Sequence, residues 1–184
     1  MNRIGTQRIE TERLILRPFA MEDAEAMFRN WASDPLVTEY LTWEPHRTVE
    51  DTRGIISLWI SEYEKGDFFN WTIELKGEAG PIGSIGVVSV DDRVDAAEIG
   101  YCMSRALWGR GLMSEALRAV IDYLFDKAGM NRVAARHDAR NPKSGRVMRK
   151  AGMTYEGTLR QTGKSNAGIC DLVYYAILSA DRKK

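Results

Sequence analysis

The chain is poor in the residues that bind metals and form disulfides. Only two of its 184 residues are cysteines and only two are histidines. Cys102 and Cys170 fall in strand-like runs without metal-ligand spacing, and His46 and His137 lie far apart. We therefore expect reduced core cysteines and no metal site. Lysine plus arginine and aspartate plus glutamate balance at 26 each. This balance gives no net field to attract nucleic acid or an anionic membrane.

Long apolar runs are also missing. The longest, residues 82–90, is too short and too rich in glycine to span a bilayer. The first seven residues show neither an apolar core nor a cleavage signal, so we expect a cytoplasmic protein. A hydrophobic content of 44% and a charged content of 28% are ordinary for a globular protein. The length predicts one domain, residues 1–184, large enough to bury a full core.

The most informative feature is a glycine loop in the middle of the chain. The segment from Trp108 to Ser114 follows a short apolar strand and leads directly into a helical pattern. Gly109 and Gly111 at this junction allow backbone N–H groups to approach a ligand at the positive end of the next helix. A phosphate or pyrophosphate is favoured there. The loop has neither the Gly-Lys-Ser/Thr of a P-loop nor the three glycines of a dinucleotide fingerprint.

Hydrophobic periodicity and turn residues predict the remaining elements. Helices are expected over residues 21–31, from Thr48 to residue 65, from the glycine loop to Gly129, and over residues 142–150. Strands are expected over residues 12–19, 68–76, 82–90, 96–103, 132–138, 153–161 and 169–178, with a polar loop over residues 162–168. This order predicts an α/β fold, a mixed sheet of about seven strands with helices on both faces.

Several motifs in this order resemble those of the GNAT superfamily of acetyl-CoA-dependent N-acetyltransferases. The nearest resemblance is to the Rim-type branch, whose known members acetylate the N-termini of ribosomal proteins. It covers nearly the whole chain and rests on residues 11–19, 34–38, 97–101, 108–116, 141–144, 150–153 and 171–175. It implies a GNAT-like fold with a splayed sheet, and acetyl-CoA as co-substrate.

The same resemblance implies the residues that bind the cofactor. The N–H groups of the loop would hold the pyrophosphate, the preceding strand end would pair with the pantetheine arm, and Asn141 would close the slot. The expected cofactor contacts are Tyr101, Cys102, Met103, Trp108, Gly109, Arg110, Gly111, Leu112, Met113, Ser114, Asn141 and Ser144. Trp108 and Met113 depart from the family's loop pattern, but a backbone N–H still donates from Met113.

Acetyl transfer to an amine needs a neutral nucleophile and a proton for the departing thiolate. Glu98, in an otherwise apolar strand beside the expected slot, is the first candidate for the base. His137 on the next strand is the alternative, and strand alternation places it on the face opposite Arg136. The resemblance places one Rim-type enzyme's base at the position of Arg136, where arginine cannot serve. Many family members place a tyrosine acid at the position of Met148, so Ser144 is the candidate acid.

The acceptor is the least determined part of the prediction. An α-amine with a pKa of ~7.8 costs about 1 kcal/mol to neutralise at pH 7, and a lysine amine costs about 4.6 kcal/mol. The leading acceptor is therefore the N-terminal α-amine of a protein or peptide. A small amine such as an aminoglycoside or polyamine, and a CoA-binding sensor without turnover, remain open. Trp43 and Glu44 are expected to line the acceptor groove, and Tyr174 with Tyr175 is the candidate surface for a homodimer.

Overall fold

The computed structural model describes residues 2 and 4–182. One mixed sheet has the strand order β1-β2-β3-β4-β5-β6-β8-β7, and every neighbouring pair is antiparallel except β5 with β6. The strands are β1 (Ile9–Glu10), β2 (Leu14–Arg17), β3 (Asn70–Leu75), β4 (Pro81–Asp91), β5 (Ala96–Met103), β6 (Arg132–Asp138), β7 (Thr154–Ser165) and β8 (Gly168–Leu178).

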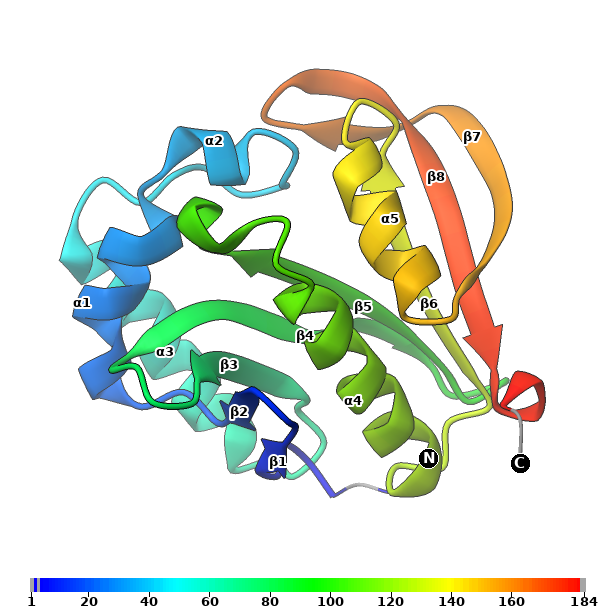
Figure 1. Ribbon diagram of the computed structural model, residues 1–184, viewed down its shortest axis with the longest axis horizontal. Coiled ribbons are helices and arrows are strands. Elements are labelled where there is room, and N and C mark those ends of the chain that lie inside the picture. The colour runs from blue at the N-terminus through cyan, green and yellow to red at the C-terminus, as the bar shows by residue number, and fades with distance from the viewer. Residues whose placement is uncertain (1, 3, 183–184) are drawn as a thin grey trace.

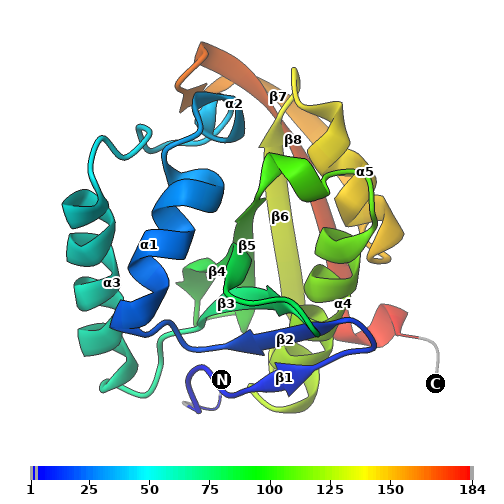
Figure 2. The same ribbon diagram turned by 60° about the vertical axis from the view of Figure 1, so that its left-hand side comes forward.

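Helices cover both faces of this sheet. They are α1 (Ala24–Met27), α2 (Pro35–Thr38), α3 (Val49–Tyr63), α4 (Leu112–Asp126) and α5 (Pro142–Lys150). Figure 2 shows α1 and α3 on one side of the sheet and α4 and α5 on the other. Within residues 2 and 4–182, none of the helices combines the length and the apolar character that a membrane span requires.

Two apolar clusters hold the layers together. The larger one joins the sheet to α4, whose inward stripe of Leu117, Val120 and Leu124 is fully buried. The smaller one lies under α1 and α3, with Trp31 and Ile56 at its centre. The spacing of these apolar positions is the helical period, so each helix buries one face against the sheet.

The parallel pair β5–β6 is short, and it positions the site. Its backbone partners run only from Ala96–Arg132 to Ile99–Ala135. Beyond that point the two strands diverge (Figure 1). Each arm stays paired with its outer neighbour, β5 with β4 and β6 with β8. We call the diverging segments, residues 100–103 of β5 and 136–138 of β6, the fork.

The elements expected from the sequence are present, with bounds that differ by a few residues. The mixed α/β sheet with helices on both faces is confirmed. It has eight strands where about seven were expected, since the two-residue β1 is too short to show a pattern in the sequence. The short α2 was not expected. The first helix is interrupted, since α1 lies between a 3₁₀ turn (Met21–Asp23) and a π-helical turn (Phe28–Ala32).

The expectation of a polar loop over residues 162–168 is wrong. Strand β7 runs to Ser165 and β8 begins at Gly168, so only Asn166 and Ala167 form the turn. Backbone pairing continues from Gly163–Cys170 to Ser165–Gly168. The end of this hairpin projects from the core, so its side chains can be polar. It is nevertheless a pair of strands, because backbone hydrogen bonds hold it together.

Two glycines give opposite predictions for stability. Gly54 lies on the exposed face of α3, with open space where a methyl group would stand, so Gly54→Ala should stabilise the fold by about 1 kcal/mol. A methyl group at Gly86 would lie 2.6 Å from Asn70 Oδ1 and 2.9 Å from the carbonyl of Phe69. Gly86→Ala should therefore destabilise it by about 1–3 kcal/mol. Urea unfolding of both variants tests this, and equal midpoints would contradict it.

Candidate active site

The glycine loop has the backbone conformation that its sequence predicts. Gly109 (φ +81°) and Gly111 (φ +79°) both adopt the left-handed conformation, and neither glycine is crowded by the atoms around it. Helix α4 begins immediately afterwards at Leu112 and runs for 15 residues. The indole N–H of Trp108 donates to the carbonyl of Met103 at 2.9 Å, which fixes the loop to the end of β5. The loop thus presents a helix N-terminus beside the fork.

A second segment braces the loop from the edge of β2. Arg13 donates to the carbonyl of Arg110 at 3.1 Å and forms an ion pair of 2.6 Å with Glu115 in the first turn of α4. The hydroxyl of Thr11 donates to the same carboxylate at 2.6 Å. Glu115 is therefore neutralised locally, and the loop is held on both sides.

A hollow of about 530 Å³ opens beside this helix start. It is lined by Glu12, Arg13, Gly111, Ser114, Glu115, Arg118 and Lys150. Arg118 also donates to the carbonyl of Lys150 at 2.7 Å, so α4 and α5 are tied together at its wall. Three cations around a helix N-terminus suit a ligand that carries several phosphates. Sequence analysis did not single out these cations, although Arg13 and Lys150 lie within the motifs on which the resemblance rests.

Two hydroxyl groups meet on the α5 side of the fork. Tyr101 reaches from β5 to the first turn of α5, where its oxygen lies 2.9 Å from Ser144 Oγ and 3.1 Å from the Ser144 carbonyl. Burial raises the pKa of Tyr101 well above its usual value. The phenol therefore stays protonated and can donate to Ser144. Sequence analysis assigned both residues but did not predict that they touch.

The other expected cofactor residues divide into two groups. The side chains of Leu112 and Met113 are buried in the first turn of α4, so their backbones alone can face a ligand, whereas Ser114, also largely buried, lines the hollow. Asn141 caps α5, its side chain accepting from the backbone N–H of Ser144 at 3.4 Å. This places it at the start of α5, and its part in closing the slot stays a prediction.

The two cysteines behave as expected. Neither forms a disulfide. The thiol of Cys102 lies 3.3 Å from Ser84 Oγ and packs toward the α1–α3 cluster, and burial raises its pKa to about 11. A thiol held protonated in this way is a poor nucleophile. Within the described residues, no three His, Cys, Asp or Glu side chains converge as metal ligands would.

The expected apolar surroundings of Glu98 are not what the structure shows. Its Oε1 lies 2.9 Å from Arg136 Nε, across the base of the fork, and its side chain is 21% exposed. The hydroxyl of Tyr174 lies 3.4 Å from Arg136 Nη1 on the next strand. Sequence reasoning missed this ion pair because its partners are 38 positions apart and meet only through the parallel register of β5 and β6.

His137 lies on the opposite face from Arg136, as strand alternation predicts. Its Nδ1 is 2.8 Å from the carbonyl of Asp138, and its ring stacks on Tyr175 at 5.9 Å. The ring wedges beneath α5, where a methyl group at Gly145 would lie only 2.6 Å from Nε2. Burial lowers the pKa of His137. This histidine and Glu98 therefore cannot act on the same face of the sheet.

The turn between β7 and β8 crosses to the loop that follows α2. Four hydrogen bonds join the two segments: Asn166 N to Leu41 O (3.1 Å), Ala167 N to Glu39 O (3.0 Å), and Asn166 Nδ2 to Thr38 O (2.9 Å) and Trp43 O (2.8 Å). We call this contact the clasp. It links the α1–α3 side of the molecule to the β6–β8 arm across the open end of the fork.

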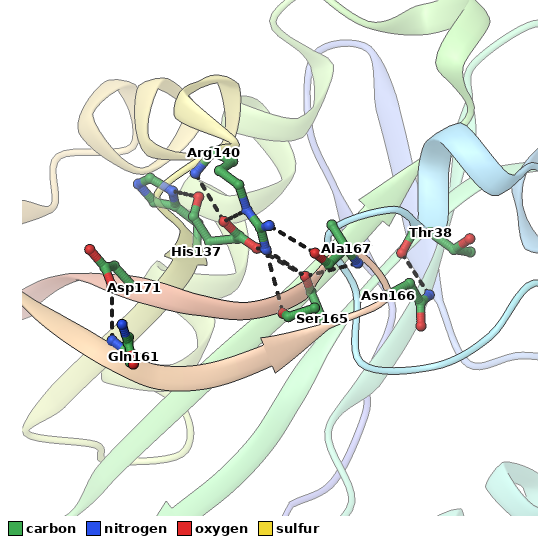
Figure 3. Close-up of polar contacts among 10 residues, drawn as sticks. Thr38, His137, Arg140, Gln161, Ser165, Asn166, Ala167 and Asp171 are labelled. Atoms are coloured by element: carbon green, nitrogen blue, oxygen red, sulfur yellow. Dashed lines mark hydrogen bonds and ion pairs between the residues drawn. The ribbon is translucent and has the colours of Figure 1, made fainter.

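A buried carboxylate at the end of β6 supports the clasp. Figure 3 shows Arg140, Ser165 and Ala167 gathered there. Asp138 pairs with Arg140 at 2.7 Å and accepts from Ser165 Oγ at 2.9 Å. Arg140 in turn donates to the carbonyl of Ala167 at 2.8 Å. Burial opposes the charge, but these partners hold the pKa of Asp138 well below its usual value. The hairpin tip is thus fixed to the end of β6 as well as to the α2 loop.

The residues expected to line the acceptor groove lie beside the clasp. Trp43 is half-buried against the α1–α3 cluster, with its ring centroid 5.5 Å from that of His46, and Glu44 is exposed. His46 is also half-buried, and its Nδ1 lies 2.7 Å from the Thr52 hydroxyl. Tyr175 is buried against His137, so it cannot offer a dimer surface, and the homodimer stays a prediction.

Comparison with known proteins shows which family has this arrangement. A family model described as an acetyltransferase (GNAT) domain matches residues 13–154. The chain belongs to the GNAT acetyltransferase family. It is thus an acyltransferase that uses acetyl-CoA, and its Rim-type resemblance is confirmed by the relatives described next.

Three proteins illustrate the range of similarity. The uncharacterized N-acetyltransferase p20 of Bacillus licheniformis is 31% identical over 175 residues, covering 95% of this chain and 98% of that protein. The ribosomal-protein-serine acetyltransferase of Escherichia coli (strain K12) is 28% identical over 127 residues, covering 69% and 70%. RimL, a ribosomal α-N-protein acetyltransferase solved with coenzyme A, shares the fold, with a TM-score of 0.84 at 22% identity, covering 96% and 100%.

Proposed function

We propose that this GNAT enzyme transfers the acetyl group of acetyl-CoA directly to the N-terminal α-amino group of a protein or peptide. The observation that carries the proposal is the fork. It places a helix N-terminus and a hydroxyl pair on the α4–α5 side and a carboxylate on the opposite face. An acyl donor and an amine can therefore approach the same gap from opposite faces.

The residues present fit coenzyme A. The glycine loop would hold the pyrophosphate, and the neighbouring hollow with Arg13, Arg118 and Lys150 would hold the remaining phosphate. The fork edge of β5, residues 101–103, lacks the β6 partner that residues 96–99 have. Apart from the Met103 carbonyl, which accepts from Trp108, its inner-edge backbone groups can pair with the amides of the pantetheine arm as an added strand would. When bound, the cofactor supplies the activated acetyl group.

Ser144 would assist the departing thiolate. Tyr101 remains protonated, and its only proton can go to the Ser144 carbonyl or to Ser144 Oγ. When it goes to Oγ, the serine proton is free to point toward the sulfur. Hydrogen bonds in such a chain strengthen one another. Tyr101 acts in this scheme through Ser144, so it is a positioning residue. Tyr101 is therefore not the acid itself, and it does not take the place of the tyrosine acid that many family members have at the position of Met148.

Glu98 would receive the amine on the other face. Arg136 Nε holds Oε1, and within the described residues Oε2 has no hydrogen-bond partner. That oxygen can accept an N–H of the incoming amine, directly or through a water molecule. An α-amine, which costs only about 1 kcal/mol to neutralise at pH 7, suits it better than a lysine.

The clasp favours the end of a polypeptide chain as the acceptor. It closes the open end of the fork between Trp43 and the β7–β8 turn, so a chain end reaches the fork more readily than a side chain on a folded surface. The name of RimL describes an α-N-protein acetyltransferase, and that of the Escherichia coli relative a ribosomal-protein acetyltransferase. The first name agrees with an N-terminal acceptor, and the second agrees with a protein acceptor.

The loop assignment predicts a charge effect at Gly111. Asp and Asn both tolerate its left-handed conformation better than other side chains, and they differ in charge alone. Acetyl-CoA should raise the Tm of the wild type, because a ligand of the native state stabilises it by mass action. Gly111→Asp should abolish that shift, and Gly111→Asn should keep a part of it. Equal shifts in the two variants would contradict the loop assignment.

The base assignment predicts a selective loss of turnover. Glu98→Gln should lower kcat by about ten- to a thousand-fold and leave acetyl-CoA binding unchanged. The loss should shrink at alkaline pH, where more of the acceptor amine is already neutral. Steady-state kinetics against an N-terminal peptide between pH 7 and 9.5 measure both effects. A wild-type rate at pH 7 would exclude Glu98 and make His137→Gln the next test.

The hydroxyl pair predicts a non-additive double mutant. Ser144→Ala should lower kcat by about ten- to a hundred-fold with little change in the KM for acetyl-CoA. Tyr101→Phe should cost less, and in the Ser144→Ala background it should cost almost nothing, since its partner is gone. Additive losses in the double variant would show that Tyr101 acts independently of Ser144. A normal kcat in Ser144→Ala would reject the acid role altogether.

A further inference from the structure

The ion pair between Glu98 and Arg136 lies at the point where the sheet opens. Ile99 and Ala135 are the last paired residues of β5 and β6. Glu98 precedes that point on one strand, and Arg136 follows it on the other. His137 packs beneath α5, so alternation directs Arg136 toward the opposite face. The guanidinium therefore stands in the mouth of the fork.

This part of the sheet face is partly open to solvent. Cys102, on the same face of β5, packs against the α1–α3 cluster, whereas the Glu98 side chain, nearer the base of the fork, is 21% exposed. The Arg136 side chain is 45% exposed. Val88 leans over Gly100, where a methyl group would lie 2.9 Å from Cγ1, and is 62% exposed. An amine bound on this face would have both an apolar wall and a charged pair within reach.

The pair leaves hydrogen-bonding capacity unused. Glu98 engages the Nε edge of the guanidinium, and Tyr174 lies at a long 3.4 Å from Nη1. Within the described residues, neither Nη2 nor Glu98 Oε2 makes a hydrogen bond. The Nη1–Nη2 end of an arginine is one of the two edges that bind a carboxylate through parallel N–H bonds. Orientation of that end by Glu98 and Tyr174 reduces the entropy that binding would cost.

We propose that Arg136 is a specificity-determining residue that binds a carboxylate next to the reacting amine. The amine would meet Glu98 Oε2 while the carboxylate meets the Nη1–Nη2 edge, so the ion pair acts as a receptor for an amine and an acid together. The acceptor class is thus an α-amine with an adjacent carboxylate. Two sources share that chemistry, a peptide that begins with an acidic residue and a free amino acid. The proposal rests on the proposed function and narrows its acceptor.

A matched arginine provides the control. Arg132 lies on the same face of β6, four positions earlier, and forms an ion pair with Glu156 at 2.7 Å. It pairs in register with Ala96, in the closed part of the sheet and away from the fork. Arg132→Gln therefore removes a guanidinium and breaks an ion pair of the same kind without touching the mouth of the fork.

The experiment compares acceptors that differ only in a carboxylate. Peptide amides beginning with Asp or Asn form one pair, and alanine with alanine amide forms the other. The kcat/KM ratio within each pair is measured for the wild type, Arg136→Gln, Arg136→Lys and Arg132→Gln. In at least one pair, Arg136→Gln should reduce the acid-to-amide ratio by about ten- to a hundred-fold. Arg132→Gln should leave it unchanged, and Arg136→Lys should fall between them because it keeps the charge without the planar edge.

The ratio separates recognition from catalysis. Arg136→Gln also alters the setting of Glu98, but that effect is common to both members of a pair and cancels. The pair in which the ratio changes identifies the source, peptide or free amino acid. An unchanged ratio in both pairs overturns the inference. If the wild type acetylates none of the four acceptors, the proposed function fails for them. Calorimetric binding of the Asp and Asn peptides in the presence of CoA then decides the inference, and equal or absent binding overturns it.

Discussion

The end of the β5–β6 ladder after Ile99 and Ala135 is the constraint on which the site depends. Each arm beyond this point keeps its antiparallel neighbour, so the strands can part without losing their own structure. What they lose is the set of hydrogen bonds between them. The backbone groups along the inner edges then need other partners, since buried N–H and C=O groups are rarely left unpaired. An opened parallel pair is therefore a binding slot made of main chain.

The width of this slot is set at three levels. The ladder closes its base, and the clasp of Asn166 and Ala167 with the α2 loop closes its open end. Between them, Tyr101 bridges from β5 to Ser144, and His137 separates β6 from α5 at a place where only Gly145 leaves room. A gap fixed at base, middle and end can hold two reactants in one geometry. Such positioning provides much of the rate acceleration of a bimolecular transfer.

The sequence predicted the parts of this structure that local pattern determines. The glycine loop, the stripe of α4 and the Thr48 cap of α3 follow from spacing within a few residues, and all are present. Contacts between distant segments were not predictable in the same way. The ion pair of Glu98 and Arg136 depends on strand register, and the bond from Asn166 to Trp43 joins residues 123 positions apart. A polar hairpin end looks like a loop in sequence, because its pairing uses backbone groups that every residue has.

The contrast between the two faces of the fork explains how one gap can serve two reactants. On the α5 side, burial keeps Tyr101 protonated, so the groups there donate hydrogen bonds and suit a developing thiolate. On the other side, a carboxylate is held by a guanidinium in a partly exposed setting, which favours charged and polar ligands. A lysine amine costs roughly 4.6 kcal/mol to neutralise at pH 7, whereas an α-amine costs only about 1 kcal/mol. The face that carries Glu98 is thus suited to an amine that is already partly neutral at pH 7. The guanidinium of Arg136 beside it adds a positive charge that disfavours a second ammonium group. For the reaction that we propose, electrostatics at this face would therefore select against polyamines and lysine-rich acceptors and favour an α-amine with an acidic neighbour.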